Sequence, residues 1–405
     1  MLLLTLVYAS HTVDRGIIAI IQEPLRAEFA LSDRQLGMVS GLAWGLSFAI
    51  AGLPLGYLVD RLNRRNLLAS LLATWSAFTA LCGFASSFPV LLVARAGMGA
   101  AESGASPTAL SLIADLFPPN RRTVALGTLQ LGSGLGVAFI FFVGGWVTTV
   151  YGWRATFFAA SALGFVLVPL LLMQLRDPRS HREEEAVSVL SSIRALGFVV
   201  RKPAFFHMVA GFVVSSMVVS GVVQWAASFF IRVHGLSLTQ AAPLTGLGAG
   251  LLVALGALAG GALGGLYSRG HFDRSARWCA LVAVLSVPPI LGMALASNTG
   301  VAAACFLLWA FVAPAFIAPA NNGFLEAAPS EVRGIAIAGI QLLANFVGVG
   351  MGSFIVGLLS DAFAGPASLR PALVIAGLGG FWSAAHFLFA ARSHPSRRTD
   401  GAPSL

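Results

Sequence analysis

The sequence has few charged residues, few cysteines and almost no lysine. Only 10% of its 405 residues are Asp, Glu, Lys or Arg, whereas 57% are hydrophobic, a balance far from that of soluble proteins. Cys82, Cys279 and Cys305 all lie within apolar runs, which excludes a disulfide framework and a cysteine zinc site. No basic stripe is interleaved with aromatics, so the net charge of +9 does not indicate nucleic-acid binding. We expect the chain to lie in a lipid bilayer.

Motifs of membrane-embedded catalysis are also missing. The sequence contains no paired His-Glu metal motif and no nucleophile with its base, so we expect neither catalytic residues nor a metal site. Gly132-Ser-Gly-Leu-Gly136 looks like part of a dinucleotide loop, but no strand precedes it, which excludes that interpretation.

Long apolar runs are abundant. A helix that crosses a bilayer needs about 20 mainly apolar residues, because its backbone groups must bond within the segment. Twelve such helices are predicted, at residues 2–22, 36–58, 66–86, 89–117, 123–149, 153–175, 204–232, 240–266, 276–296, 299–325, 334–360 and 370–391.

The basic residues indicate the orientation. An even number of spans places both termini on one side, and cytoplasmic loops carry an excess of Lys and Arg. Most of the 25 basic residues share the side of the termini; those expected on the other side are Arg26, Arg34, Arg154, Arg232 and Arg370. We therefore expect cytoplasmic termini and contact with anionic membrane lipids. Compact loops and an arginine-rich composition favour a bacterial cytoplasmic (inner) membrane.

One polar stretch divides the chain. We expect a six-helix bundle at residues 1–175, a cytoplasmic linker at 176–202, a second six-helix bundle at 203–392 and a cytoplasmic tail at 393–405. Two motifs recur between the halves at nearly the same offset, which favours a duplication with a binding site between the halves. They are Gly56-x-Leu58-x-Asp60-Arg61 with Gly264-x-Leu266-x-Ser268-Arg269, and Arg122 and Gln130 with Arg333 and Gln341.

Small residues form stripes on several predicted helices. They permit close approach of backbones, either as static packing or as smooth faces on which the halves move. The stripes are Gly37, Gly41 and Gly45; Gly132 and Gly136; Gly256, Gly260 and Gly264; and Gly348 and Gly352.

Four ionisable residues lie inside predicted spans. Asp14 and Arg15 fall midway along the first, and Arg95 and Glu102 lie nearly two turns apart on one face of the fourth. Because such charges are costly in hydrocarbon, they face water or one another. A fixed ion-pair network is one interpretation. We favour a proton-linked switch in which Asp14 or Glu102 carries the proton, with no other cofactor, and Arg15 and Arg95 bind an anionic substrate.

Other polar side chains are candidates for the interior. Gln224, Trp225, Asn321 and Asn345 are predicted to contact substrate, although hydrogen bonding between helices is the alternative for each. His11, one turn before Asp14, can titrate near neutrality but is expected to be satisfied or interfacial.

The loop after the second span combines a glycine, an acid and clustered bases. We expect it to hold one conformation closed, through pairing of the acid with a base or a helix N-terminus. The predicted gating residues are Gly56, Asp60, Arg61, Arg64 and Arg65, with Arg122 and Arg333 in later loops.

This loop, Gly56-Tyr-Leu-Val-Asp60-Arg61-Leu-Asn-Arg64-Arg65, resembles the signature loop of the major facilitator superfamily. The helix count, the linker and the degenerate second copy extend the resemblance over essentially the whole chain. It implies an all-α membrane protein with the major-facilitator fold, in which twelve transmembrane helices form two pseudo-symmetric six-helix bundles that work by alternating access.

Within that superfamily the first half resembles the spinster group of lipid and lysolipid transporters. The resemblance implies that Asp14, Arg15, Arg95 and Glu102 serve proton coupling and substrate contact. The chain departs from the group where His11-Thr12 replaces the usual Asn-Tyr and Ala101 a usual glycine. The matching residues are Asp14-Arg15, Ser32-Asp33, Gly37, the Gly56–Arg64 loop, Arg95, Gly99, Glu102, Leu112-Ile-Ala-Asp115-Leu-Phe117, Gly132-Ser-Gly-Leu-Gly136, Gly152-Trp-Arg154 and, more weakly, His234-Gly-Leu-Ser237.

We therefore expect a monomeric, proton-coupled carrier of a lipid-like or amphipathic anionic molecule such as a lysolipid or sphingolipid. A proton antiporter for drugs, sugars or small organic acids is the first alternative; residues 123–149 contain no proline, which disfavours drug antiport. A receptor that does not transport, or a membrane-embedded enzyme, is the second.

Overall fold

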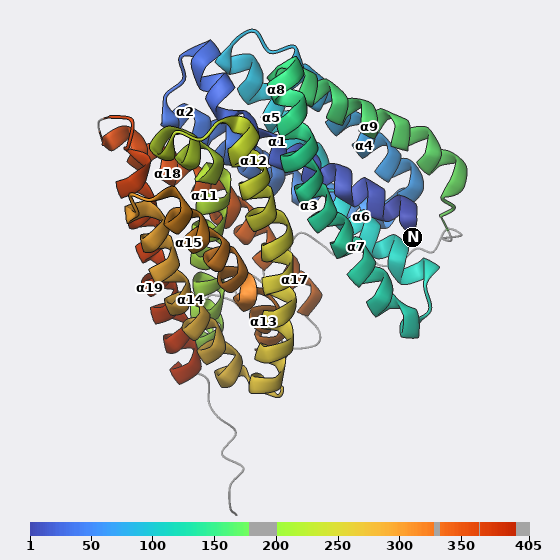
Figure 1. Cartoon of the computed structure of the whole chain (residues 1–405). Helices are drawn as coiled ribbons and strands as arrows, with labels where there is room; N and C mark the ends of the chain where they lie inside the picture. The colour runs from blue at the N-terminus through green and yellow to red at the C-terminus, as the bar shows by residue number, and fades with distance from the viewer. Residues whose placement is uncertain (178–200, 328–332, 364, 394–405) are drawn as a thin grey trace, which may run out of the picture.

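The computed structural model describes residues 1–177, 201–327, 333–363 and 365–393. Most of the predicted linker and tail therefore lies outside the described residues. Within them every regular element is a helix, and the helices form two bundles (Figure 1).

The first bundle fills the predicted spans in order. Its helices are α1 (Leu2–Phe29); α2 (Asp33–Gly37), a π-helical turn (Met38–Leu42) and α3 (Ala43–Arg61); α4 (Arg64–Gly83); α5 (Phe88–Glu102) and α6 (Ala105–Leu116); α7 (Pro119–Phe139), a π-helical turn (Ile140–Gly144) and α8 (Gly145–Tyr151); and α9 (Trp153–Gln174).

The second bundle repeats this order. Its helices are α11 (Pro203–His234); α12 (Leu238–Gly246), a π-helical turn (Leu247–Leu252) and α13 (Val253–Ser268); α14 (Phe272–Leu295); α15 (Thr299–Val312), a 3₁₀ turn (Ala313–Phe316) and α16 (Ile317–Ala327); α17 (Arg333–Leu343), a π-helical turn (Ala344–Gly350) and α18 (Met351–Ala362); and α19 (Leu369–Ser393).

Among the described residues, 11 helices are long and apolar enough to cross a membrane. The fourth predicted span, 89–117, differs because α5 ends at Glu102 and α6 begins at Ala105. Its two pieces have 15 and 12 residues, each shorter than a spanning helix requires. The break lies beside Glu102, one of the predicted proton carriers.

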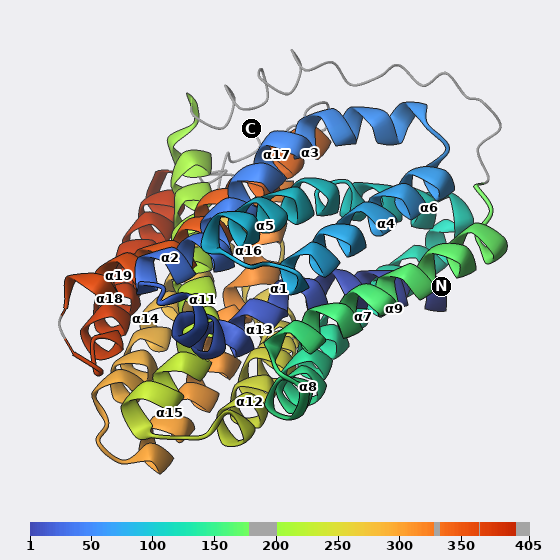
Figure 2. The same ribbon diagram turned by 90° about the horizontal axis from the view of Figure 1, so that it is seen from above.

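The second, fifth, eighth and eleventh spans each contain a π-helical turn. Such turns are frequent at functional sites. These same four spans join the halves, because α2 and α3 pack on the eleventh span and α7 and α8 pack on the eighth. Seen from above, α2 lies beside α18 at this junction (Figure 2).

The glycine stripes differ in what they pack against: one contacts the other half, and the others contact helices of their own half. Gly37 and Gly45 face the eleventh span, where an added Cβ would lie 2.9 Å from the Cα atoms of Phe354 and Gly350 respectively. The stripe of the second span therefore permits contact between the halves. The others pack inside one half: Gly132 against Thr5, for example, and Gly256 against Phe311. For them the static-packing interpretation fits.

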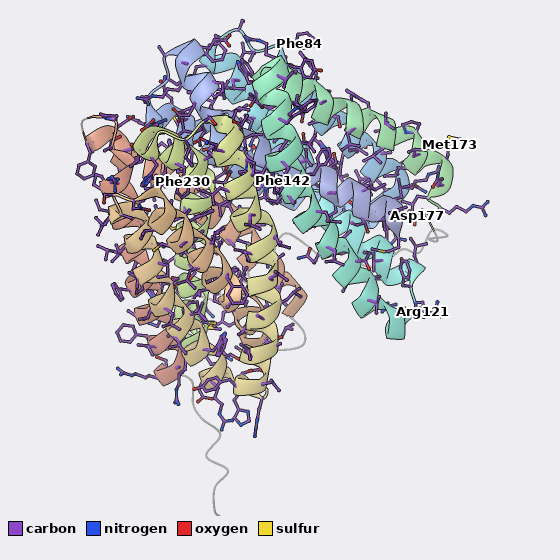
Figure 3. The ribbon with its side chains drawn as sticks, viewed as in Figure 1. Phe84, Arg121, Phe142, Met173, Asp177 and Phe230 are labelled. Carbon is purple, nitrogen blue, oxygen red and sulfur yellow. The ribbon has the colours of Figure 1, made fainter. Side chains whose placement is uncertain are left out.

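The two bundles meet at one end and their ribbons diverge toward the other (Figure 1). Phe84 marks the end where they meet and Arg121 the diverging end of the first bundle (Figure 3). Arg232 of α11 contacts Glu23 of α1 at the joined end, whereas the N-terminus lies toward the diverging end (Figure 1).

Candidate functional site

The first four spans bring the predicted ionisable residues together inside the first half. Asp14, Arg95 and Glu102 are at most 1% exposed, and Arg15 is half-buried. Arg95 Nη1 donates to the backbone oxygen of Asp14 at 3.1 Å, and its Nε donates to that of Val39 at 3.2 Å. Arg95 thus joins the fourth span to the first and second, and its predicted substrate contact stays a prediction.

The two carboxylates are held by neutral donors. Thr79 Oγ1 donates to Asp14 Oδ1 at 3.1 Å, and Trp44 Nε1 donates to Glu102 Oε2 at 2.7 Å. The second oxygen of Glu102 is buried and has no hydrogen-bond partner in the described part of the chain. Among these fully described residues, no carboxylate oxygen of Asp14 or Glu102 lies within 4.0 Å of a guanidinium nitrogen. The fixed ion-pair interpretation therefore does not describe this conformation.

Arg15 reaches the other half. Its guanidinium carbon lies 4.0 Å from the centre of the Trp44 ring, and Nη2 donates to Asn345 Oδ1 at 3.5 Å. Asn345 belongs to the π-helical turn of the eleventh span and donates to the Gln341 carbonyl at 2.9 Å. Two predicted substrate-binding residues, Arg15 and Asn345, thus lie together across the junction.

The remaining predicted binding residues are dispersed. Trp225 is fully buried and donates from Nε1 to the Ser353 carbonyl at 2.9 Å, as the helix-packing alternative expects. Gln224 is half-buried, with its Oε1 unpaired, and Asn321 is half-buried on α16. Substrate contact by these residues stays a prediction.

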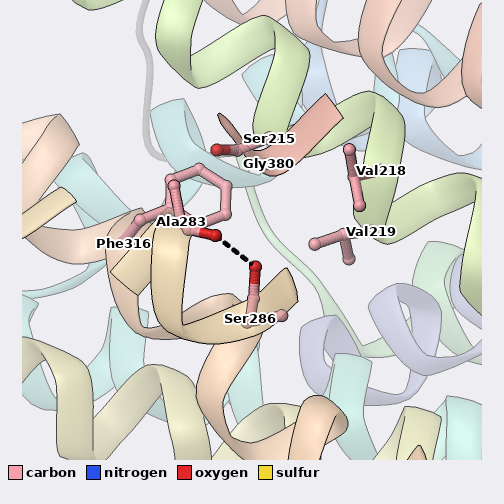
Figure 4. Close-up of a pocket in the computed structure, with 8 residues that line it drawn as sticks. Ser215, Val218, Val219, Ala283, Ser286, Phe316 and Gly380 are labelled. Atoms are coloured by element: carbon pink, nitrogen blue, oxygen red, sulfur yellow. Dashed lines mark hydrogen bonds between the residues drawn. The ribbon is translucent and has the colours of Figure 1, made fainter. Parts of the chain in front are cut away.

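A hollow in the second half does not accommodate a substrate. It lies between α11, α14, α19 and the 3₁₀ turn Ala313–Phe316, and its lining includes Ser215, Ser286 and Phe316 (Figure 4). Ser286 Oγ donates to the Ala283 carbonyl at 2.8 Å. The cavity of about 10 Å³ has room for about one water molecule.

Arg64 binds the ends of three segments of the first half. Its buried guanidinium lies 2.6 Å from Asp115, near the end of α6, and 2.7 Å from Asp177, after α9. Nη1 also donates to Ser111 Oγ at 2.9 Å. Arg64 therefore stabilises the first bundle itself in this conformation.

The other predicted gating residues lie near the diverging end. Arg61 is exposed and covers the Tyr57 ring at 4.1 Å, and exposed Arg122 donates to the Phe117 carbonyl at 3.1 Å. Arg65 is half-buried and donates to Asn66 Oδ1 at 3.0 Å. An added Cβ at Gly56 would meet nothing within 4 Å.

The side chains of Asp60 and Arg333 lie outside the described part of the structure. The gating role of the whole set stays a prediction. The described contacts of Arg61, Arg64, Arg65 and Arg122 join residues of the first half, and the halves are closed at their opposite ends.

A charged latch closes the joined end. Arg232 Nη1 lies 2.7 Å from both carboxylate oxygens of Asp33, and its Nε lies 2.7 Å from Glu23 Oε1. Asp361, from the second half, accepts from the backbone nitrogens of Asp33 and Arg34 at 2.9 and 2.8 Å. The sequence placed Arg232 away from the cytoplasm, but only the fold shows which acids it meets.

Comparison with known proteins identifies the family. Residues 4–353 match the model of the Major Facilitator Superfamily. The chain belongs to this superfamily. It is a multi-pass membrane transporter rather than an enzyme, which confirms the fold and the class predicted from the sequence.

The relatives of this chain include proteins named as an efflux pump and as a sugar-acid transporter. An MFS-type efflux pump of Mycolicibacterium smegmatis is 28% identical over 89% of this chain and 83% of its own length. A probable galactarate/D-glucarate transporter of Escherichia coli (strain K12) is 25% identical over 96% of this chain and 93% of its own. The crystal structure of a bacterial homolog to the human lysosomal transporter Spinster, inward-facing and unoccupied, matches the fold with a TM-score of 0.85. It is 23% identical and covers 97% of this chain and 96% of that one.

Proposed function

We propose that this superfamily member is a monomeric, proton-coupled carrier of an organic anion in a bacterial cytoplasmic membrane, with both termini in the cytoplasm. Protons are its only coupling ion. The observation that carries the proposal is Arg15, whose half-buried guanidinium lies at the junction beside Asn345 of the other half. A ligand held there touches both halves, so its binding and their movement are linked.

Arg15 is suited to bind an anion because most of the hydrogen-bond donors of its guanidinium group have no described partner. Its contact with Asn345 is long, at 3.5 Å, and its other described contact is the Trp44 ring. A guanidinium offers five donors that match a carboxylate or phosphate in pairs. An anionic group of the substrate can therefore replace the amide of Asn345 with stronger, charge-assisted bonds.

Asp14 and Glu102 support proton coupling. Both are buried, and no guanidinium nitrogen of a described arginine lies within 4.0 Å of their carboxylates. One oxygen of Glu102 has no hydrogen-bond partner among the described residues. A small rearrangement that brings a cation or water to such a carboxylate changes whether it holds a proton. Arg15 and Glu102 both contact Trp44. The charge of a substrate bound to Arg15 and the protonation of Glu102 therefore influence each other.

Uptake into proteoliposomes tests the proposal. Purified protein is given labelled galactarate, glucarate or a lysophospholipid, each with and without an imposed pH gradient. We expect accumulation of a sugar acid that depends on the gradient and is lost in Arg15→Gln. Arg26→Gln, an exposed arginine on the same helix, is the matched control. Absence of gradient-dependent transport for every anion would refute the proposal.

A lipid-like amphipathic anion is the second candidate. It is favoured by the close fold match to the bacterial Spinster homolog, together with the resemblance of the first half to the spinster group. Transport of the lysophospholipid without either sugar acid would select this candidate, and the reverse pattern would exclude it.

A further inference from the structure

His11 is buried inside the same cluster with its polar atoms unpaired. It is 3% exposed, and its ring stacks on Tyr8 at 5.6 Å and meets Trp75 edge-on at 6.3 Å between centroids. Its Nε2 lies 3.4 Å from Glu102 Oε2, yet neither ring nitrogen makes a hydrogen bond to any described residue. The two aromatic rings thus hold an imidazole in front of a carboxylate.

Leaving buried polar atoms unpaired is costly, about 1–3 kcal/mol for each group. Here His11 Nδ1, His11 Nε2 and Glu102 Oε1 are all in this state. Such exceptions require an explanation, because native proteins pair nearly all their buried polar atoms. A modest rotation of the imidazole would align its Nε2 with Glu102, so the two groups are placed to bond in another state of the cycle.

We propose that His11 and Glu102 together hold the coupling proton. This inference rests on the proposed function and assigns its proton to a pair of residues. One proton can be held as neutral imidazole with a protonated carboxyl, or as imidazolium with a carboxylate. Both forms have zero net charge, which suits a site shielded from water. When the proton leaves to water, neutral His11 donates from Nε2 to the remaining carboxylate.

The charges around the pair connect it to substrate. The charged groups that act on the pair are Asp14 and Arg15 of α1 and Arg95 of α5, and Tyr8 stacks on the imidazole. Trp44 lies between Arg15 and Glu102, with its ring 4.0 Å from the guanidinium carbon and its Nε1 2.7 Å from the carboxylate. An anion bound to Arg15 neutralises the cation that favours ionised Glu102, so the pair takes up a proton and both are carried together.

Position 11 also provides a suitable variant, since the spinster group usually has asparagine there. His11→Asn keeps a side-chain donor toward Glu102 and removes the titratable ring. The matched control is His207→Asn on α11, whose ring is half-buried and pairs through Nδ1 with His386 Nδ1 at 2.9 Å, far from the cluster in the other half. Folding of each variant is checked by its thermal midpoint in detergent.

The test is the pH profile of gradient-driven uptake into proteoliposomes, measured with galactarate or, if only the lysophospholipid is transported, with the lysophospholipid. Losing the imidazolium form weakens proton binding, so the pH of half-maximal uptake in His11→Asn is expected to fall by about one unit, equivalent to roughly tenfold in proton affinity. His207→Asn is expected to keep the wild-type profile. If His11→Asn does not fold, His11→Gln replaces it, because its amide also reaches toward Glu102.

The two hypotheses fail in different ways. A wild-type profile in a folded His11→Asn or His11→Gln protein would overturn the shared proton and leave the proposed function intact. Wild-type protein that transports galactarate, glucarate and lysophospholipid independently of any pH gradient, or not at all, would refute the proposed function itself.

Discussion

Replacing Arg232 with glutamine should open the closed end of the transporter. Arg232 belongs to the second half, whereas its partners Asp33 and Glu23 belong to the first. Its side chain is only 6% exposed, and each of its ion pairs has a shortest distance of 2.7 Å. Arg232→Gln removes the charge-assisted bonds to both acids while keeping a polar side chain of moderate length.

The expected magnitude follows from the burial of the latch. Removing one partner of a buried ion pair costs about 3–5 kcal/mol, because the remaining charge stays buried without a counterion. Asp33 and Glu23 reach water once the halves separate at this end, so the penalty applies mainly to the closed conformation. A difference of about 3 kcal/mol changes the equilibrium between two conformations by roughly 150-fold.

Pulsed electron paramagnetic resonance measures this equilibrium. Spin labels are attached at positions 30 and 367, which are exposed and belong to different halves, after replacement of the native cysteines. In Arg232→Gln we expect most molecules in proteoliposomes to show a longer distance between the two spin labels than in the wild type. Arg154→Gln is the control, because Arg154 pairs with Glu28 at 2.7 Å within the first half and both side chains are 40% exposed.

An unchanged distance distribution in folded Arg232→Gln protein would refute this reasoning. It would mean that the apolar and glycine contacts close this end without the latch. The same longer distance in Arg154→Gln would refute it as well, since that arginine joins no residues across the junction.

Gly41→Ala adds a methyl group against Gly350 and Ser353 of the eleventh span. It should therefore raise the reactivity, toward a water-soluble thiol reagent, of a cysteine that replaces Ser40, which is buried against Ser353. Gly127→Ala, where an added methyl meets nothing within 4 Å, should not, and equal reactivity would show that close glycine contact is unimportant. Arg64→Gln should destabilise the first bundle by about 3 kcal/mol or more, because Asp177 loses a buried partner; the thermal midpoint in detergent should fall well below that of Arg65→Gln, and equal midpoints would contradict the assignment. Arg15→Lys keeps the charge but loses the paired donors, so KM for the transported anion should rise about tenfold or more, whereas an unchanged KM would move the anion site elsewhere.

Much of the fold is predictable from the sequence because the bilayer allows few solutions. Apolar runs of sufficient length must be helices, and their number and basic flanks indicate the membrane topology. Helix α1 continues to Phe29, beyond the predicted end of the first span at residue 22. Glu23 and Glu28 in this extension pair with arginines of other helices. Polar residues at a helix end do not reveal such partners by themselves.

The core of the candidate site is predictable for the same physical reason. Charges inside apolar runs are rare enough that Asp14, Arg15, Arg95 and Glu102 attract attention without a structure. Their neighbours are not predictable in this way. His11 looks like an interfacial histidine until the fold places it 3.4 Å from Glu102.

Contacts between distant segments and the positions of the π-helical turns also could not be predicted from the sequence. Arg232 meets acids that lie about two hundred residues earlier in the chain. Arg64, predicted as a gating residue, is buried and pairs with Asp115 and Asp177. The π-helical turns occur in glycine-containing runs such as Met38–Leu42, but α-helical runs such as Val253–Ser268 contain glycine as well, so composition does not distinguish the two. Each depends on packing between spans that local periodicity does not encode.

The central claim is that a buried carboxylate couples proton movement to substrate movement, and Glu102→Gln tests it most directly. The substitution removes the titratable group while nearly preserving its shape. The measurement is the accumulation ratio of the transported anion in proteoliposomes under an imposed pH gradient, compared between wild type and Glu102→Gln. The account predicts accumulation above equilibrium for the wild type and none for the variant. Gradient-driven accumulation by Glu102→Gln equal to that of the wild type would contradict it.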